Sequence, residues 1–346
     1  MADRDLWISR STLLRHALFT LVGLVLALAV CKAIDDAHAF EYVQIPAYAC
    51  TAIGLTLLTG MSGQISLGQG AFMMVGAYTF ALLWPKWTTD PNLTMIAAFA
   101  CAMAVSAVFG ALVGVAAARL RGPYLAGATL ALAVGLPSIT EYEHLSNHLK
   151  GNQGLSLPIL VSPGFFSDTQ WSLVVGVLCV IVLLFLTANL VRSRVGRSMR
   201  AVRDDEIAAS LGGLSVPSVQ VLAFVISAAW AGLGGALLAL ANSNASPNAF
   251  GLSVSLAVLA AVVIGGLGSL TGAVIGSIVV VMLNQTWAQD LASHLSISSA
   301  KVANNMYLVI YGVLLAVAML IAPGGVMGIL RRIFGFAVPR QRAAEQ

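Results

Sequence analysis

Eight long apolar stretches run through this 346-residue chain, and they leave it few ways to fold. A membrane-spanning helix needs roughly 20 mainly apolar residues, and each stretch reaches or nearly reaches that length. Only 9% of the residues are charged, whereas a soluble domain carries about 25% because its surface must face water. The sequence therefore predicts an all-α polytopic membrane protein. It excludes a soluble enzyme, a disordered tail, a secreted disulfide scaffold and a nucleic-acid binder.

The apolar stretches are of two kinds. Six have the length of a single span: 17–34, 93–118, 122–140, 172–191, 218–242 and 304–322. Two others, 45–84 and 252–285, are too long for one span, and glycine and polar residues interrupt them at 60–70 and 265–272. We expect a pair of short helices around each interruption, which either crosses the membrane or re-enters it. The prediction is about ten membrane helices: six full spans plus two glycine-broken helical pairs.

The basic residues predict the orientation of the chain. With the N-terminus inside, all the arginines fall on the cytoplasmic side and only the four lysines fall on the other. Both termini are then cytoplasmic, and the chain divides into an N-terminal segment (1–16), one transmembrane domain (17–322) and a C-terminal tail (323–346). The sequence at 37–39 resembles a signal-peptidase site. The length of the preceding apolar stretch nevertheless favours a retained first span over a cleaved signal.

The order of the stretches predicts an internal repeat. A leading span, a broken pair and a closing span occur twice in the same order. They are 17–34, 45–84 and 93–118 in the first half, and 218–242, 252–285 and 304–322 in the second. Both units begin on the cytoplasmic side, so the repeat is parallel. Interrupted segments at matching places in two halves favour a solute path between them. The alternative is that glycine-rich helices merely pack closely in lipid.

No catalytic or ion-coupling group stands out. The segment 63–68 has the spacing of a phosphate-binding loop, but Gln69 and Gly70 replace the lysine and the hydroxyl residue that such a loop requires. No acidic residue lies in the middle of a span, where ion-coupled carriers usually have one. The four cysteines lack metal-binding spacing, and we expect them to pack as small apolar residues. We therefore expect no catalytic residue, metal site or cofactor in this chain.

A basic stretch at 193–213 joins two spans, and its pattern predicts an amphipathic helix over 195–213. The apolar residues that share one face of this helix are Val195, Met199, Val202 and Ala209. Gly212 and Gly213 would end the helix, as glycines commonly do. Such a helix either lies on anionic lipid or transmits force from a soluble partner.

The same stretch carries a family resemblance. Glu206-Ile-Ala-Ala-Ser-Leu-Gly212 resembles the EAA loop of ABC importer permeases, and the runs 196–213 and 222–236 are similar to the LivM-type permeases of branched-chain amino acid importers. Three further motifs are similar to that family: Gly63-Gln-Ile-Ser-Leu-Gly-Gln-Gly-Ala-Phe72, Leu120-Arg-Gly-Pro-Tyr-Leu125 and Gly265-Gly-Leu-Gly-Ser-Leu-Thr-Gly272. The resemblance covers about residues 45–325. It departs at Leu149-Lys-Gly-Asn-Gln-Gly154, where the family often has Thr-Gly-Gly-x-x-Gly.

The resemblance implies a non-catalytic permease subunit of a bacterial inner-membrane ABC importer for leucine, isoleucine and valine. It also implies a second similar permease, two cytoplasmic ATPase subunits that bind ATP and Mg²⁺, and an external solute-binding protein. Segment 195–213 would be the coupling helix that the ATPases move. Urea or short-chain amides are the alternative solutes. A stand-alone secondary carrier or channel is the alternative from another class, and a membrane-embedded enzyme would need a polar cluster that the spans lack.

Two groups of residues are candidates for these roles. The two breaks offer hydroxyls and amides to a weakly polar solute, and non-helical backbone at membrane depth survives only where it is buried or lines a cavity. The predicted path residues are Ser62, Gln64, Ser66, Gln69, Ser269 and Thr271. The residues that the resemblance places at the ATPase contact are Arg200, Arg203, Asp204, Glu206, Ala209, Gly212 and Gly213.

Overall fold

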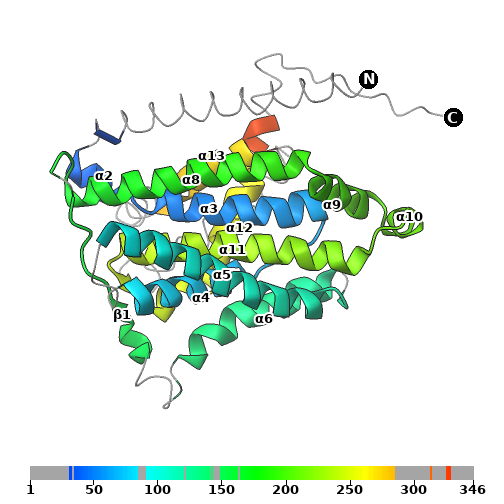
Figure 1. The fold of residues 1–346 in the computed structure, drawn as a ribbon, viewed down its shortest axis with the longest axis horizontal. Coiled ribbons are helices and arrows are strands. Elements are labelled where there is room, and N and C mark those ends of the chain that lie inside the picture. Colours follow the sequence, from blue (N-terminus) through cyan, green and yellow to red (C-terminus); the bar gives the residue numbers. More distant parts are fainter. Residues whose placement is uncertain are drawn as a thin grey trace.

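The structure is a computed structural model that describes residues 31–32, 35–84, 91–120, 122–140, 142, 149–162, 164–284, 312–313 and 325–328. Within these residues the chain is almost entirely helical, and its long helices lie side by side in one bundle (Figure 1). The helices are α2 (Asp36–Tyr42), α3 (Ile45–Leu55), η1 (Thr56–Met61), α4 (Gln69–Leu83), α5 (Pro91–Ala117), α6 (Pro123–Ile139), η3 (Gly151–Gln153), α8 (Asp168–Arg192), α9 (Arg194–Asp204), α10 (Glu206–Leu211), α11 (Val216–Ala241), η4 (Pro247–Phe250), α12 (Leu252–Gly265) and α13 (Leu270–Met282).

The bundle has two distinct ends (Figure 1). Helices α9 and α10 lie at one of them, the α9 end. The short strands β1 (Leu155–Ser156) and β2 (Asn244–Ala245) lie at the other, the β1 end, where they pair in antiparallel fashion. Two further hydrogen bonds extend this ribbon: the Leu157 N–H donates to the Ser243 carbonyl (2.9 Å), and Asn244 Nδ2 donates to the Gln153 carbonyl (3.2 Å). The connection between α6 and α8 is thereby tied to the end of α11.

The long apolar helices confirm a multi-pass membrane protein. Within the described residues, five helical stretches are long and apolar enough to cross a membrane: Ala39–Met61, Thr94–Ala117, Asp168–Arg192, Val216–Ala241 and Pro247–Gly265. The predicted span 122–140 is a shorter helix, α6, of 17 residues. The predicted spans 17–34 and 304–322 lie almost wholly outside the described residues, as do both chain termini. The repeat and the orientation of the termini therefore stay predictions.

Helix α11 occupies the centre of the bundle because its glycines let three other helices approach closely. A side chain at Gly232 would overlap Ser106 of α5, and a side chain at Gly235 would overlap the backbone of Met73 in α4. A third glycine of α11 lies in the same way against α3. Small residues at helix contacts are a common means of packing in membranes, where lipid is as apolar as the side chains. Most of α3 and α11 is buried, whereas α5 and α8 present large apolar side chains on the bundle surface.

The first glycine break lies between η1 and α4, where the sequence predicts it. Its residues 63–68 are non-helical and run from the α9 end into the interior of the bundle. The Leu67 N–H donates to Thr129 Oγ1 (3.0 Å) near the middle of α6. Gln69 Nε2 donates to Ser227 Oγ (3.2 Å) near the middle of α11. Helix α4 therefore starts inside the bundle, and the chain crosses half of it without helical hydrogen bonds.

The helix before this break is longer than predicted. Residues 39–61 form one apolar helical stretch of 23 residues, long enough to span a membrane, so the expectation of a short helix is wrong here. The extra length lies at the start, where α2 and a two-residue turn precede α3. The π-helical turn η1 carries the helix only one residue past Gly60, the first residue of the expected interruption. Single π-turns of this kind occur often at functional sites.

The second glycine break is a tight turn of a few residues between α12 and α13, as predicted. Gly266 and Gly268 both have positive φ angles (109° and 83°), which favour glycine. Ser269 Oγ then accepts the N–H of Gly272 and caps the start of α13. Helix α13, with 13 residues, is short, in agreement with the sequence. Helix α12 has 14 residues, but together with η4 it forms the apolar helical stretch Pro247–Gly265, which is long enough to cross a membrane, so the expectation of a short helix is wrong there.

Candidate functional site

The predicted coupling segment 195–213 forms two helices, not one. Helix α9 ends at Asp204, and Asp205 has an extended backbone (φ −158°, ψ 110°). The Asp205 carboxylate accepts the N–H groups of Ile207 and Ala208 at 2.8 and 3.0 Å, which makes it the N-cap of α10. The prediction of one continuous helix is wrong because this cap begins a new helix one residue after α9 ends.

Other features of the segment agree with the sequence. Met199, Val202 and Ala209 are buried, as expected for one apolar face, and Val195 is partly buried. At the other end, the N–H of Leu214 donates to the Ala209 carbonyl (3.1 Å) and the N–H of Gly213 donates to the Ser210 carbonyl (3.0 Å). Gly213 has a φ of 85°. These two bonds form a Schellman motif, so the glycine pair ends α10 as predicted.

Arg203 joins α9 to the first glycine break. Its Nη1 atom donates to the carbonyl of Gly60, the penultimate residue of η1, at 2.7 Å. The rest of the guanidinium is held by the neighbouring carboxylate, since Nε and Nη2 both donate to Asp204 Oδ1 at 2.9 and 2.7 Å. The first break also lies against the arginine side chain: a Cβ on Gly63 would lie 2.8 Å from Arg203 Cγ.

The second glycine break also contacts Gly60. A Cβ on Gly60 would lie 2.6 Å from both the Cα and the N of Gly268, so the two breaks pack backbone to backbone. We call the group formed by Arg203, Gly60 and Gly268 the junction. Sequence reasoning missed it, because 143 residues separate Arg203 from Gly60 and no local signal pairs them. The only hint was that both breaks are rich in glycine.

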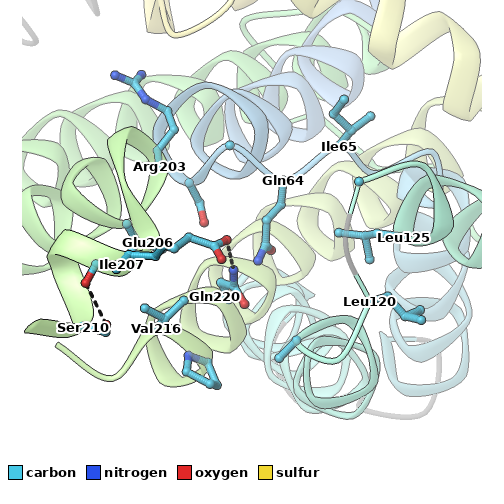
Figure 2. A pocket seen from close by; sticks show the side chains of 16 residues that line it. Gln64, Ile65, Leu120, Leu125, Arg203, Glu206, Ile207, Ser210, Val216 and Gln220 are labelled. Carbon is cyan, nitrogen blue, oxygen red and sulfur yellow. Dashed lines mark hydrogen bonds between the residues drawn. The ribbon is translucent and has the colours of Figure 1, made fainter.

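A cavity of about 490 Å³ lies beside the junction, between the first break, α9, α10 and the start of α11 (Figure 2). Ser62 and Gln64 line it from the break, and Glu206 lines it from α10. Glu206 Oε1 accepts a hydrogen bond from Gln220 Nε2 of α11 at 3.0 Å. Figure 2 shows the Gln64 side chain pointing toward Gln220 and Glu206. A predicted path residue and a predicted ATPase-contact residue thus share one cavity.

The remaining path candidates lie elsewhere. Ser66 and Gln69 are buried inside the bundle, where the Ser66 hydroxyl accepts the N–H of Gly68 (3.3 Å). Ser269 caps α13, and Thr271, two residues further along, is exposed. Neither Ser269 nor Thr271 lines the cavity. The structure therefore brings Ser62 and Gln64 together and separates them from the candidates of the second break.

The remaining contact candidates are mostly open to the surroundings. Asp204, Gly212 and Gly213 are exposed, and Arg200 is partly buried. Among the described residues, no group of three or more histidine, cysteine, aspartate or glutamate side chains is placed to hold a metal ion.

A comparison with family models decides the class of this membrane protein. The model of the branched-chain amino acid transport system permease component matches residues 40–319, which include both breaks, the junction and the cavity. The chain belongs to this family. The match confirms the resemblance drawn from the motifs, and it identifies the chain as a membrane component of an ABC transporter that is not itself an enzyme.

Individual relatives agree with the family assignment. The high-affinity branched-chain amino acid transport system permease protein LivM of Salmonella typhimurium is 33% identical over 300 residues, which cover 78% of this chain and 68% of LivM. LivM of Escherichia coli is 34% identical over 267 residues, which cover 68% of this chain and 60% of that protein. LivH of Escherichia coli, a permease protein of the same description, is 28% identical over 295 residues, which cover 81% of this chain and 91% of LivH. No solved structure matches the chain.

Proposed function

We propose that this chain is one permease subunit of an ABC importer in a bacterial inner membrane, and that it admits leucine, isoleucine and valine. It works with a second similar permease, two cytoplasmic ATPase subunits that bind ATP and Mg²⁺, and an external solute-binding protein. The names of LivM and LivH support this solute class. The similarity of one chain to both of these permeases supports assembly with a homologous partner.

The α9 end faces the cytoplasm in this proposal. Basic residues gather there on α8, α9 and the end of α5: Arg119, Arg192, Arg194, Arg197, Arg200 and Arg203. Cytoplasmic loops of membrane proteins carry such an excess of arginine and lysine. Both termini are then cytoplasmic, and α9 with α10 forms the coupling segment on which the ATPases act. The β1 end faces outward, toward the solute-binding protein.

The junction is the observation that carries the mechanism. When nucleotide binding closes the ATPases, they move α9 and α10, with Glu206, Gly212 and the neighbouring charges at the contact. The charge-assisted hydrogen bond from Arg203 passes that movement to Gly60, and the packing of Gly60 on Gly268 passes it to the second break. Both breaks therefore respond to one displacement, as a switch between inward-open and outward-open states requires.

The solute path follows the first break. Residues 63–68 lack helical hydrogen bonds, so they can change shape without breaking a helix. Gln64 and Ser66 within this run, and Ser62 and Gln69 on either side of it, offer hydroxyl and amide groups along half of the bundle. A weakly polar lining suits a zwitterion with an aliphatic side chain, because the external binding protein selects the solute and the permease only lets it pass.

Uptake by intact cells tests this function. Cells that contain the partner subunits, with and without this chain, take up labelled leucine or labelled urea. We expect leucine uptake to be lost without the chain and urea uptake to be unchanged. Loss of urea uptake alone would replace the solute and keep the importer. Loss of neither would overturn the proposed function.

A further inference from the structure

A groove of about 640 Å³ lies between the end of α5 and the start of α11, at the α9 end of the bundle. Further from this end, glycines of α5 bring the two helices into close contact. A Cβ on Gly110 would overlap Ala228, and a Cβ on Gly114 would lie 3.0 Å from Phe224 Cβ. No glycine occurs at 115–119, where α5 lines the groove. The groove therefore opens where the close contact between the helices ends.

The lining of this groove is mostly apolar. Its apolar residues are Val115, Ala118, Pro217, Val221, Leu222 and Val225. Its polar residues are Ser218, whose hydroxyl pairs with that of Ser215 (2.9 Å), and Arg119; no carboxylate occurs in this lining. The Arg119 side chain is exposed and has no hydrogen-bond or ion-pair partner among the described residues. A free guanidinium beside an aliphatic surface favours an amphiphile with a negatively charged group.

Arg119 lies at the depth of lipid headgroups. The membrane-spanning stretch of α5 ends at Ala117, just before it. Val108, Leu112 and Val115 are exposed on one face of α5, at helical spacing, and this row leads to the groove. The distance along the helix from Val108 to Arg119 is about 16 Å, close to half of a hydrocarbon core of about 30 Å. An acyl chain along this face thus places its phosphate beside the guanidinium.

The start of α11 adds a second positive feature. Pro217 and Ser218, in the first turn of this 26-residue helix, line the groove. The N-terminal end of a helix carries a partial positive charge, so this end and Arg119 both favour a negative group. A headgroup that carries its own ammonium offers less net negative charge than one that does not. Basic pockets between membrane helices are sites of a kind that binds anionic headgroups.

We propose that an anionic phospholipid occupies this groove, with its phosphate beside Arg119 and one acyl chain against α5 and α11. The guanidinium selects the headgroup, and the aliphatic wall holds the chain. The site borders the start of α11, which follows the coupling segment proposed above. The proposal depends neither on the identity of the solute nor on the direction of transport.

Native mass spectrometry of the purified transporter tests the site. The full-length chain with its partner subunits is stripped of lipid in detergent, then titrated with phosphatidylglycerol or phosphatidylethanolamine that carry the same acyl chains. We expect the first phosphatidylglycerol to bind about tenfold more tightly, the effect of one hydrogen bond to a charged group. Glycerol 3-phosphate, which has no acyl chain, is expected not to compete.

Two pairs of variants locate the lipid. Arg119→Gln is expected to abolish the preference for phosphatidylglycerol, and Arg119→Lys to keep it. Arg194→Gln, which removes an exposed arginine at the start of α9, is expected to keep it as well. Val115→Trp fills the groove and is expected to weaken phosphatidylglycerol binding about tenfold. Val182→Trp, the same change at a similarly exposed position of α8 (49% against 55%), is expected to have no effect.

Several outcomes would overturn the proposal. They are equal binding of the two lipids by the wild type, an equal loss of preference in Arg119→Gln and Arg194→Gln, equal weakening by both tryptophan variants, and full competition by glycerol 3-phosphate. The same spectra report which subunits remain together. If Val115→Trp releases the partner permease while lipid binding stays unchanged, the groove is a contact between proteins and the proposal fails.

Discussion

The break before α4 and the break before α13 hold their backbones in different ways. The first is a run of six non-helical residues, 63–68, and hydroxyl groups from other helices anchor it and the start of α4. The second is a short turn in which glycines of α12 and α13 lie in direct contact, so that a side chain on Gly265 or Gly272 would overlap the other's backbone. Hydrogen bonds can exchange partners while the chain moves, but close backbone packing cannot. Glycines also pack closely in the first break, where a Cβ on Gly70 would lie 2.5 Å from the Phe250 carbonyl oxygen. Its longer non-helical run is nevertheless held by exchangeable hydrogen bonds as well, so we expect it to move more easily than the second break.

A side chain in the second break is expected to have the largest effect. Gly272→Val would overlap the carbonyl of Gly265, and no flexible side chain is there to give way. We expect a loss of about 3 kcal/mol in the free energy of unfolding and little assembled complex. The measurement is thermal unfolding of the purified complex, followed by size exclusion. Gly127→Ala is the control, because its new Cβ meets nothing within 4 Å; equal melting of the two variants would contradict rigid packing.

Loss of the hydrogen bond that joins α9 to the first break is expected to have the second-largest effect. Arg203→Ala removes the charge-assisted hydrogen bond to Gly60, worth about 1.5–3 kcal/mol, while both breaks remain folded. We expect ATP hydrolysis by the complex to continue and leucine uptake to fall about tenfold or more. Proteoliposomes report both rates at once. Arg194→Ala, which removes an exposed arginine from the same helix, serves as the comparison. A parallel fall in hydrolysis and uptake would argue against the junction as a transmitter.

A substitution that affects the first break is expected to reduce stability less. Ser255→Ala removes the hydroxyl that accepts the Gly70 N–H at 2.9 Å, where the break enters α4. Leaving this buried N–H unpaired costs about 1–2 kcal/mol. Thermal unfolding should show a modest decrease in the melting temperature, smaller than that of Gly272→Val, and none for Ser172→Ala at the partly exposed start of α8. If Ser255→Ala proved as damaging as Gly272→Val, the two breaks would be equally rigid.

Ser269 gives the smallest expected effect. It was selected from the sequence as a path residue, but in the structure its hydroxyl caps α13. Ser269→Ala is expected to cost about 1 kcal/mol of stability, the usual worth of such a cap, and to leave leucine uptake intact. Thr271→Ala, at an exposed position, is expected to change neither quantity. A selective loss of uptake in either variant would return the second break to the solute path.

Sequence reasoning succeeded where the signal is local. Apolar length located the helices, glycine and polar clusters located both breaks, and the pair Gly212 and Gly213 located the end of α10. It failed at Asp205, although an aspartate before an acidic residue is a common helix start. The apolar stripe continues past that residue and suggested one helix. The junction and the cavity depend on contacts between segments distant in the chain, and no periodicity or motif encodes such a contact.

Helix α11 connects the two ends of the molecule as a single rod. It begins a few residues after α10 and ends at the ribbon that holds the β1-end connection, and its 26 residues extend about 39 Å. If each end of this rod carries a docking surface, as proposed above, and docking at one end displaces the rod, the two binding events are thermodynamically linked. If contact at the β1 end changes the affinity of α9 and α10 for an ATPase, then the nucleotide state of the ATPase changes the affinity at the β1 end by the same factor. Binding at the β1 end and the nucleotide state of the ATPase would then influence each other even while no solute crosses the membrane.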